Sequence, residues 1–239
     1  MSFGPTLSIV TVAYNDLDAL RMTVESVIQI DFHDLEYIII DGGSTDGSKE
    51  YLESLSIPYL NWISESDEGI FDAFNKGIRL ASGAWVHLLN AGDFYSAAEV
   101  FSAINFSEEY DFICFSVLKK KKKDYVWVPK IEHNPSFVNV AHPGLVVRRD
   151  FYLAVAMYSV RFKFVSDSHF IWRYVSPENS EIYDIVLVEM ADGGYSTRWS
   201  FEHELEKHKL IASSEIGVFS KVRLHFKYFI AGVYKWLFR

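Results

Sequence analysis

The sequence predicts an α/β protein with a mostly parallel central sheet flanked by helices, followed by a C-terminal helical extension. Three observations support this. Short apolar runs rich in β-branched residues alternate with segments of helical periodicity in the first hundred residues. Each run ends in a polar or glycine-containing turn. Finally, 239 residues with 49% hydrophobic side chains can form one sizeable core.

Four strand–helix repeats are visible in order. The predicted strands are residues 7–12 (LSIVTV), 37–40 (YIII), 59–63 and 85–89. Asp16 is positioned to cap the helix after the first strand, a second helix begins at Thr45 or Asp46, and a third spans residues 70–81. Such repeats form right-handed crossovers, which make neighbouring strands parallel.

The second half is less regular. Residues 111–118 and 125–128 predict a hairpin around the lysine run 119–123, residues 144–147 and 183–190 predict strands, and residues 166–174 predict a short helix capped by Ser166. A helical pattern runs from Phe201 to the end. We therefore expect one domain over residues 1–200 and a helical extension over residues 201–239.

Composition excludes several classes of protein. The net charge of −9 argues against a nucleic-acid partner, since such binders are usually basic. Cys114 is the single cysteine, so an intramolecular disulfide and a multi-cysteine metal site are excluded. No signal peptide and no apolar run of spanning length is visible, so the expected location is cytoplasmic.

Polar clusters follow three of the predicted strands: Tyr14-Asn15, residues 41–44 and residues 90–93. Ligands of such sheets bind beyond the carboxyl ends of the strands. Acids there could contact a base and ribose, and hold Mg²⁺ or Mn²⁺ beside a diphosphate. Taken alone, residues 41–44 are better explained as a strand-to-helix turn, and residues 90–93 are equally well explained as a turn. The dinucleotide, P-loop and nucleophile-elbow glycine motifs are absent, which excludes three common rival functions.

The segments LSIVTVAYN, YIIIDGGSTDGS and DEGIFDAFNKGIRLASGAWVHLLNAGD, in this order, resemble family 2 glycosyltransferases of the GT-A (Rossmann-like) fold. HPGLVVRRDFY and FVSDSHFIWRY resemble the later part of that family, and GGYST resembles its bacterial surface-polysaccharide branch. The resemblance implies a nucleotide-sugar half over residues 1–100 and an acceptor half over residues 101–200. It implies inverting transfer from a nucleotide-diphosphate sugar to a saccharide or lipid-linked saccharide acceptor.

The resemblance also implies roles for the first two clusters. Tyr14 and Asp41 would contact the base and ribose, although Gly42 replaces the second acid usual in the family. Asp67 and Asn75 would lie near the donor, with a solvated helix face as the alternative.

Two further positions carry the implied chemistry. Residues 90–93 occupy the family's Asp-x-Asp-like position, where Gly92 replaces the usual metal-bound acid and leaves Asn90 near the donor and Asp93 beside the metal. Asp167 matches the catalytic base within the pattern G/S-D-x-x-F-x-W-R. The alternative for Asp167 is an acid stabilised by a helix N-terminus.

Several features stay open at this level. The glycines at 42 and 92 also allow a noncatalytic sugar-nucleotide-binding or scaffold protein. The lysine run is a solvated hairpin tip or a contact for anionic lipid or a lipid-linked diphosphate. His142 is more simply a hydrogen-bonded structural residue than a diphosphate contact. The basic, amphipathic residues 221–239 predict peripheral membrane contact or, equally well, a packed helix.

Overall fold

The computed structural model describes residues 4–120, 123–132, 138–191 and 200–213, together with Lys221 and His225. The strands are β1 (Leu7–Ala13), β2 (Leu35–Asp41), β3 (Leu60–Ser64), β4 (Trp85–Asn90), β5 (Phe94–Tyr95), β6 (Phe112–Lys119), β7 (Tyr125–Trp127), β8 (Lys130–Ile131), β9 (Val138–Asn139), β10 (Leu145–Arg148) and β11 (Ser180–Met190). The helices are α1 (Leu17–Ile28), α2 (Ser48–Ser54), α3 (Ile70–Leu80), α4 (Arg149–Ala154), α5 (Ser166–Tyr174), α6 (Phe201–Ser213) and the 3-10 turn η1 (His142–Gly144).

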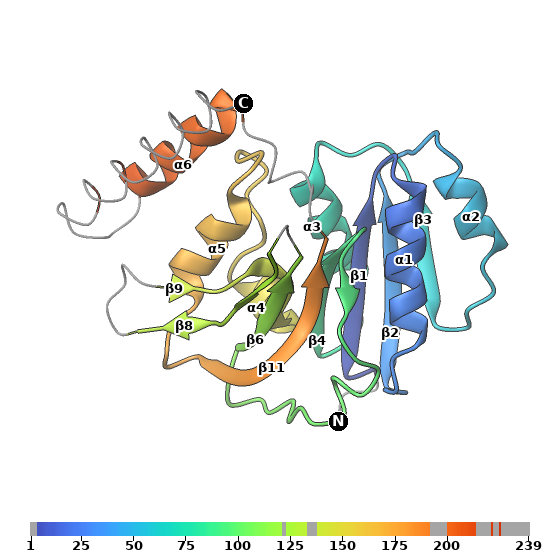
Figure 1. Ribbon diagram of the computed structural model, residues 1–239, viewed down its shortest axis with the longest axis horizontal. Coiled ribbons are helices and arrows are strands. Elements are labelled where there is room, and N and C mark those ends of the chain that lie inside the picture. The colour runs from blue at the N-terminus through green and yellow to red at the C-terminus, as the bar shows by residue number, and fades with distance from the viewer. Residues whose placement is uncertain are drawn as a thin grey trace.

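One large sheet connects both halves of the chain in the order β3-β2-β1-β4-β10-β6-β11-β5, with β7 paired to β6 (Figure 1). The strands β3, β2, β1 and β4 are parallel, as predicted. The second half is mixed: β10 is antiparallel to both β4 and β6, whereas β11 is parallel to β6. The predicted α/β class is confirmed, with the parallel arrangement concentrated in the first half.

Helices cover both faces of this sheet, which accounts for the uniformly apolar strands. Val10 and Ile40 pack on one face in the cluster that includes residues of α3, α4 and α5. Ile9 and Ile39 pack on the opposite face with residues of α1 and α2. Figure 1 shows α1 in front of the sheet and α3 behind it. The core therefore lies in two layers, one on each face of the sheet.

Local sequence signals predicted most elements well. Asp16 caps α1 by accepting the Ala19 N–H at 3.2 Å, and the predicted hairpin is formed by β6 and β7. The predicted cap at Ser166 is wrong: Val165 is the cap residue of α5, and the buried Ser166 hydroxyl has no hydrogen-bond partner among the described residues. The second helix also starts later than predicted, because Gly47 adopts a left-handed φ of 99° immediately before Ser48.

The C-terminal helical pattern begins as predicted, with α6. The Glu206 carboxylate of α6 accepts the N–H groups of Lys163 and Phe164, each at 2.8 Å, and the His203 ring stacks on Phe164 at 5.1 Å. These contacts join α6 to the segment that leads into α5. The predicted amphipathic segment 221–239 lies almost wholly outside the described residues. No helix within the described ranges is both long and apolar enough to cross a membrane.

Candidate active site

The polar segments after β1, β2 and β4 meet at one edge of the sheet. Strand register places Ala13 opposite Asp41 and Val12 opposite Asn90. The loops after β1 and β2 are also joined by hydrogen bonds, because the Asn15 N–H donates to Ser44 Oγ at 2.8 Å and the Thr45 N–H donates to Asn15 Oδ1 at 2.8 Å. The convergence expected from the sequence is therefore present.

Asp41 is fully buried at the end of β2. Its Oδ2 accepts the Ser44 N–H at 3.0 Å and the Ser64 hydroxyl at 2.6 Å, while its Oδ1 accepts the Ser44 hydroxyl. This carboxylate therefore joins the loop after β2 to the end of β3. Its predicted contact with a base or ribose stays a prediction.

Asp67 lies where the side chain of a second strand-end acid would extend. A Cβ added to Gly42 would lie 2.7 Å from Asp67 Oδ2 and 3.2 Å from Tyr14 Cδ2. Tyr14 is 66% exposed, and Asp67 is half-buried with its Oδ1 accepting the Gly69 N–H at 2.8 Å. The small Gly42 thus lies between an exposed aromatic ring and a carboxylate. Together the two side chains offer stacking and hydrogen bonding to a nucleoside.

Asn75 is buried in α3 and anchors the backbone of Tyr158. Its Nδ2 donates to the Tyr158 carbonyl at 2.8 Å, and its Oδ1 accepts the Tyr158 N–H at 3.0 Å. The Tyr158 hydroxyl is 3.1 Å from His142 Nε2 and 3.1 Å from the Tyr152 hydroxyl. His142 is therefore a buried, hydrogen-bonded residue, as the simpler interpretation predicted. A direct contact between Asn75 and a donor remains a prediction.

The turn after β4 buries Asp93. Its Oδ2 accepts the Asn90 side-chain amide at 3.0 Å, and the Ala191 N–H also donates to this carboxylate. Burial raises the pKa of Asp93 to about 6, against the opposing effects of these bonds and of the nearby Lys119 ammonium. Gly92 has a φ of 97°, a conformation that an aspartate adopts only under strain. Its backbone therefore favours glycine at this position.

Asp167 lies in the first turn of α5. Its Oδ1 accepts the Ser168 N–H at 2.7 Å, and poor solvation of the carboxyl raises its pKa to about 6. A cavity of about 470 Å³ opens beside this residue. A carboxylate with a raised pKa on a cavity wall has the properties of a general base.

The cavity wall includes side chains that the sequence did not identify as functional. They come from four different elements: Lys119 of β6, Trp127 of β7, Trp172 of α5 and Lys207 of α6. Lys119 was predicted as part of a solvated hairpin tip, and this is wrong for Lys119, which belongs to β6 and lines the cavity. The only sequence signal for this placement was its position at the end of a buried apolar strand.

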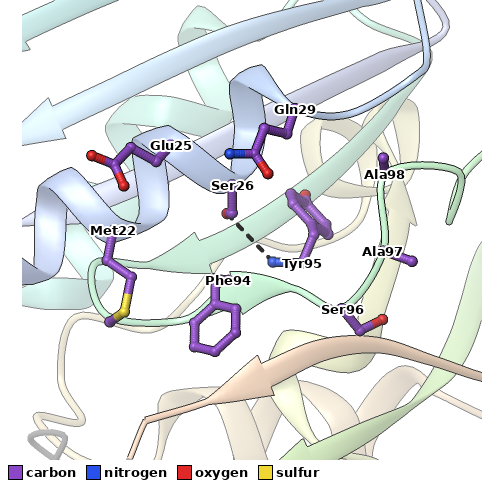
Figure 2. A pocket seen from close by; sticks show the side chains of 9 residues that line it. All are labelled: Met22, Glu25, Ser26, Gln29, Phe94, Tyr95, Ser96, Ala97 and Ala98. Atoms are coloured by element: carbon purple, nitrogen blue, oxygen red, sulfur yellow. Dashed lines mark hydrogen bonds between the residues drawn. The ribbon is translucent and has the colours of Figure 1, made fainter.

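A second hollow of about 260 Å³ lies between α1 and residues 94–98 (Figure 2). Met22 and Glu25 of α1 face this hollow, and the Ser26 hydroxyl accepts the Tyr95 N–H at 3.4 Å. None of the predicted site residues lines it. This hollow is therefore separate from the strand-end residues and from the cavity beside Asp167.

Comparison with known proteins gives matches at the level of sequence family and of fold. The family model described as Glycosyl transferase family 2 matches residues 8–170. An uncharacterised glycosyltransferase of Mycobacterium tuberculosis is 41% identical over 101 residues, covering 42% of this chain and 38% of that protein. A PGL/p-HBAD biosynthesis glycosyltransferase of Mycobacterium bovis is 26% identical over 177 residues, covering 70% of this chain and 68% of that protein. The match to the first relative thus spans less than half of its length.

Solved structures support the fold. TarS residues 1–349 of S. aureus, in complex with UDP-GlcNAc, superposes with a TM-score of 0.64 at 13% identity, covering 93% of this chain and 71% of that chain. The mannosyltransferase PcManGT of Pyrobaculum calidifontis, in complex with GDP-Man and Mn²⁺, gives a TM-score of 0.66 at 16% identity, covering 95% of this chain and 70% of that chain.

Proposed function

Because the chain belongs to glycosyl transferase family 2, we propose that it is a glycosyltransferase that transfers a sugar from a nucleoside-diphosphate sugar to a saccharide acceptor with inversion. The observation that carries the mechanism is the Asp167 carboxylate on the wall of the large cavity. Complexes of TarS with UDP-GlcNAc and of PcManGT with GDP-Man support a nucleotide-sugar donor.

The proposed reaction is a single displacement. An acceptor hydroxyl in the cavity transfers its proton to Asp167 as its oxygen bonds to the anomeric carbon of the donor sugar. The bond from that carbon to the diphosphate oxygen breaks at the same time, and the nucleoside diphosphate leaves. A base pKa near 6 keeps Asp167 ionised at pH 7 and makes it a stronger proton acceptor than an ordinary carboxylate.

On the donor side, we assign the base and ribose to Tyr14 and Asp67. Both side chains lie against Gly42, so a nucleoside can stack on the exposed tyrosine ring and hydrogen-bond to the carboxylate. Asp41 does not contact the nucleoside in this proposal; it fixes the loop after β2 by accepting hydrogen bonds from Ser44 and Ser64. Asn90 extends the proposed donor surface to the end of β4, whereas Asn75, which is buried against the Tyr158 backbone, stays a predicted donor residue.

The residues present fit a divalent cation only together with the donor. The described ranges hold no group of three or more histidine, cysteine, aspartate or glutamate side chains that could bind a metal. Asp93 supplies one carboxylate, and Mg²⁺ commonly combines one or two carboxylates with substrate phosphates. When bound, Mg²⁺ or Mn²⁺ would neutralise charge on the leaving diphosphate.

We expect Asp93→Ala to abolish the dependence of nucleotide affinity on Mn²⁺, because the variant removes the single carboxylate of this turn. Calorimetric titration of UDP and GDP, in EDTA and in Mn²⁺, measures the effect. Asp18→Ala on the exposed side of α1 is the matched control. Identical affinities under both conditions, in wild type and variant alike, would exclude a metal role for Asp93.

On the acceptor side, Trp127 and Trp172 provide flat apolar surfaces in the same cavity as Asp167. Sugar rings carry C–H faces that pack on aromatic rings, so these indoles suit a saccharide. The Trp127 Nε1–H donates to Asn139 Oδ1 at 3.0 Å, which fixes the orientation of this indole. These contacts support a saccharide acceptor in the cavity.

We expect Trp127→Ala to raise the acceptor KM roughly 5-fold or more, because tryptophan is enriched among the interface residues whose truncation costs more than about 1 kcal/mol. The donor KM should be unchanged. Steady-state kinetics with each substrate varied in turn measures both constants. Tyr125→Ala, an exposed aromatic of the same strand, is the control. Equal effects on both KM values would argue against an acceptor contact.

The direct test of the whole proposal is a panel of UDP, GDP, CDP and dTDP sugars. A ligand that binds the folded protein raises its melting temperature, so thermal shift identifies the donor before any acceptor is known. A role in polysaccharide assembly on a lipid-linked acceptor is part of the proposal, motivated by the PGL/p-HBAD biosynthesis relatives. Peripheral membrane contact by residues 221–239 rests on their basic, amphipathic sequence alone.

A further inference from the structure

We propose that Lys119 binds the diphosphate of the donor at the boundary between Asp93 and Asp167. Its ammonium supplies positive charge at a site whose single carboxylate binds a metal cation only weakly. This inference rests on the proposed function, because it assumes a nucleoside-diphosphate donor. It adds a phosphate-binding residue of the second half to a donor site predicted from the first half.

Strand pairing brings Lys119 to this boundary. It is the last residue of β6 and lies opposite Met190 of β11. Both side chains line the cavity that contains Asp167. The residue after Met190 is Ala191, whose N–H donates to the Asp93 carboxylate. The wall that carries Lys119 is therefore shared between the acceptor cavity and the buried acid of the donor side.

Electrostatics agree with this geometry. Asp93 is 6% exposed, and its carboxylate lies close enough to Lys119 to interact electrostatically with the ammonium. The next residue behaves differently. Lys120 Nζ lies 2.9 Å from Glu189 Oε2 and 3.6 Å from Asp124 Oδ2, at 42% side-chain exposure. Two consecutive lysines thus have separate surroundings, one beside the candidate site and one in a surface ion pair.

A lysine at this position suits the chemistry. As the bond to the anomeric carbon breaks, negative charge accumulates on the leaving diphosphate, and a preorganised cation stabilises it. An ammonium bonds to phosphate oxygens without needing further acids as ligands. Gly92 deprives the turn of a second carboxylate, and its left-handed backbone disfavours restoring one. A fixed cation compensates for the missing metal ligand.

The experiment uses the full chain with three variants: Lys119→Met, the charge-conserving Lys119→Arg, and Lys120→Met as the matched control. Calorimetry measures the affinity for UDP and GDP and for uridine and guanosine, each in EDTA and in Mn²⁺. For whichever diphosphate the wild type binds, we expect Lys119→Met to weaken binding about 10-fold or more, since hydrogen bonds to charged groups are worth about 1.5–3 kcal/mol. The affinity of Lys119→Met for the matching nucleoside should equal that of wild type. Lys120→Met should bind the diphosphate as tightly as wild type, and Lys119→Arg should keep most of this affinity.

The outcomes separate this inference from the proposed function. If wild type binds a nucleoside diphosphate and Lys119→Met binds it equally well in both buffers, Lys119 is not a donor ligand, while the transferase proposal stands. If Lys119→Met leaves nucleotide binding unchanged and lowers only the affinity of the nucleotide-saturated protein for added inorganic pyrophosphate, the lysine binds an acceptor diphosphate. The donor assignment is then overturned. Should Lys119→Met fail to fold, the polar, uncharged Lys119→Gln takes its place: unchanged diphosphate affinity in this folded variant overturns the inference. Wild type that binds no nucleotide of the panel contradicts the donor itself.

Discussion

Replacing Asp167 by asparagine is expected to lower kcat by about 10²–10⁴-fold while nucleotide binding persists. The amide keeps the size and the hydrogen bond to the Ser168 N–H, but it cannot take a proton from the acceptor hydroxyl. Kinetics with a saturating donor, combined with calorimetric titration of the nucleotide, measure the two effects separately.

The pH dependence gives a second readout of the same residue. Asp167 accepts a proton only when it is ionised, so kcat/KM of the wild type should rise with pH through about 6 and level off above it. Asp167→Asn should lack this limb. Because the folded-state pKa is raised above the unfolded value, Asp167 favours the folded state at low pH and loses this contribution as pH rises through about 6. The variant should therefore be at least as stable as wild type at pH 7.

Asp150 provides the control for the alternative that Asp167 is merely an acid at a helix start. It lies in the first turn of α4, as Asp167 lies in the first turn of α5, but its side chain is exposed. Asp150→Asn should leave turnover unchanged. Near-normal turnover by Asp167→Asn would reject the assignment of the base and favour a noncatalytic sugar-nucleotide-binding protein.

The first half of the fold was predictable because its signals are local. Runs such as residues 7–12 and 37–40 are buried on both faces and therefore read as strands, and Asp16 caps α1 through a neighbouring N–H. The strand-end clusters followed from parallel topology alone. Asp167 came from the family resemblance, and the structure adds the cavity beside it.

The rest depends on contacts between distant segments. Two-residue strands such as β5 and β9 have no periodicity to detect, since pairing with another segment defines them. Lys119, Trp127 and Lys207 share a cavity only after β6, β7 and α6 have packed. The lysine run also looked uniform in sequence, whereas β6 pairing separates Lys119 from Lys120. Packing between distant segments thus determines which residues line the cavity beside Asp167.

Asp41 and Asp67, the two acids near Gly42, also have roles that depend on contacts between distant segments. Their replacement should affect stability very differently. Asp41→Ala should lower the free energy of unfolding by about 3 kcal/mol or more, because two buried donors of Ser44 and the half-buried hydroxyl of Ser64 lose a charged acceptor. Asp67→Ala should change stability little, because this half-buried side chain accepts the exposed Gly69 N–H. Urea denaturation at pH 7 measures both differences.

Nucleotide binding should show the opposite ranking. Asp67→Ala removes the carboxylate that lies beside Tyr14 and Gly42, so it should weaken UDP or GDP binding in a fully folded protein. Asp41→Ala should weaken binding only to the extent that the loop after β2 loses its order. An Asp41→Ala variant with wild-type stability and no nucleotide binding would make Asp41 the ligand, as its position in the sequence first suggested. The two substitutions therefore distinguish a residue that builds the donor site from one that contacts the donor.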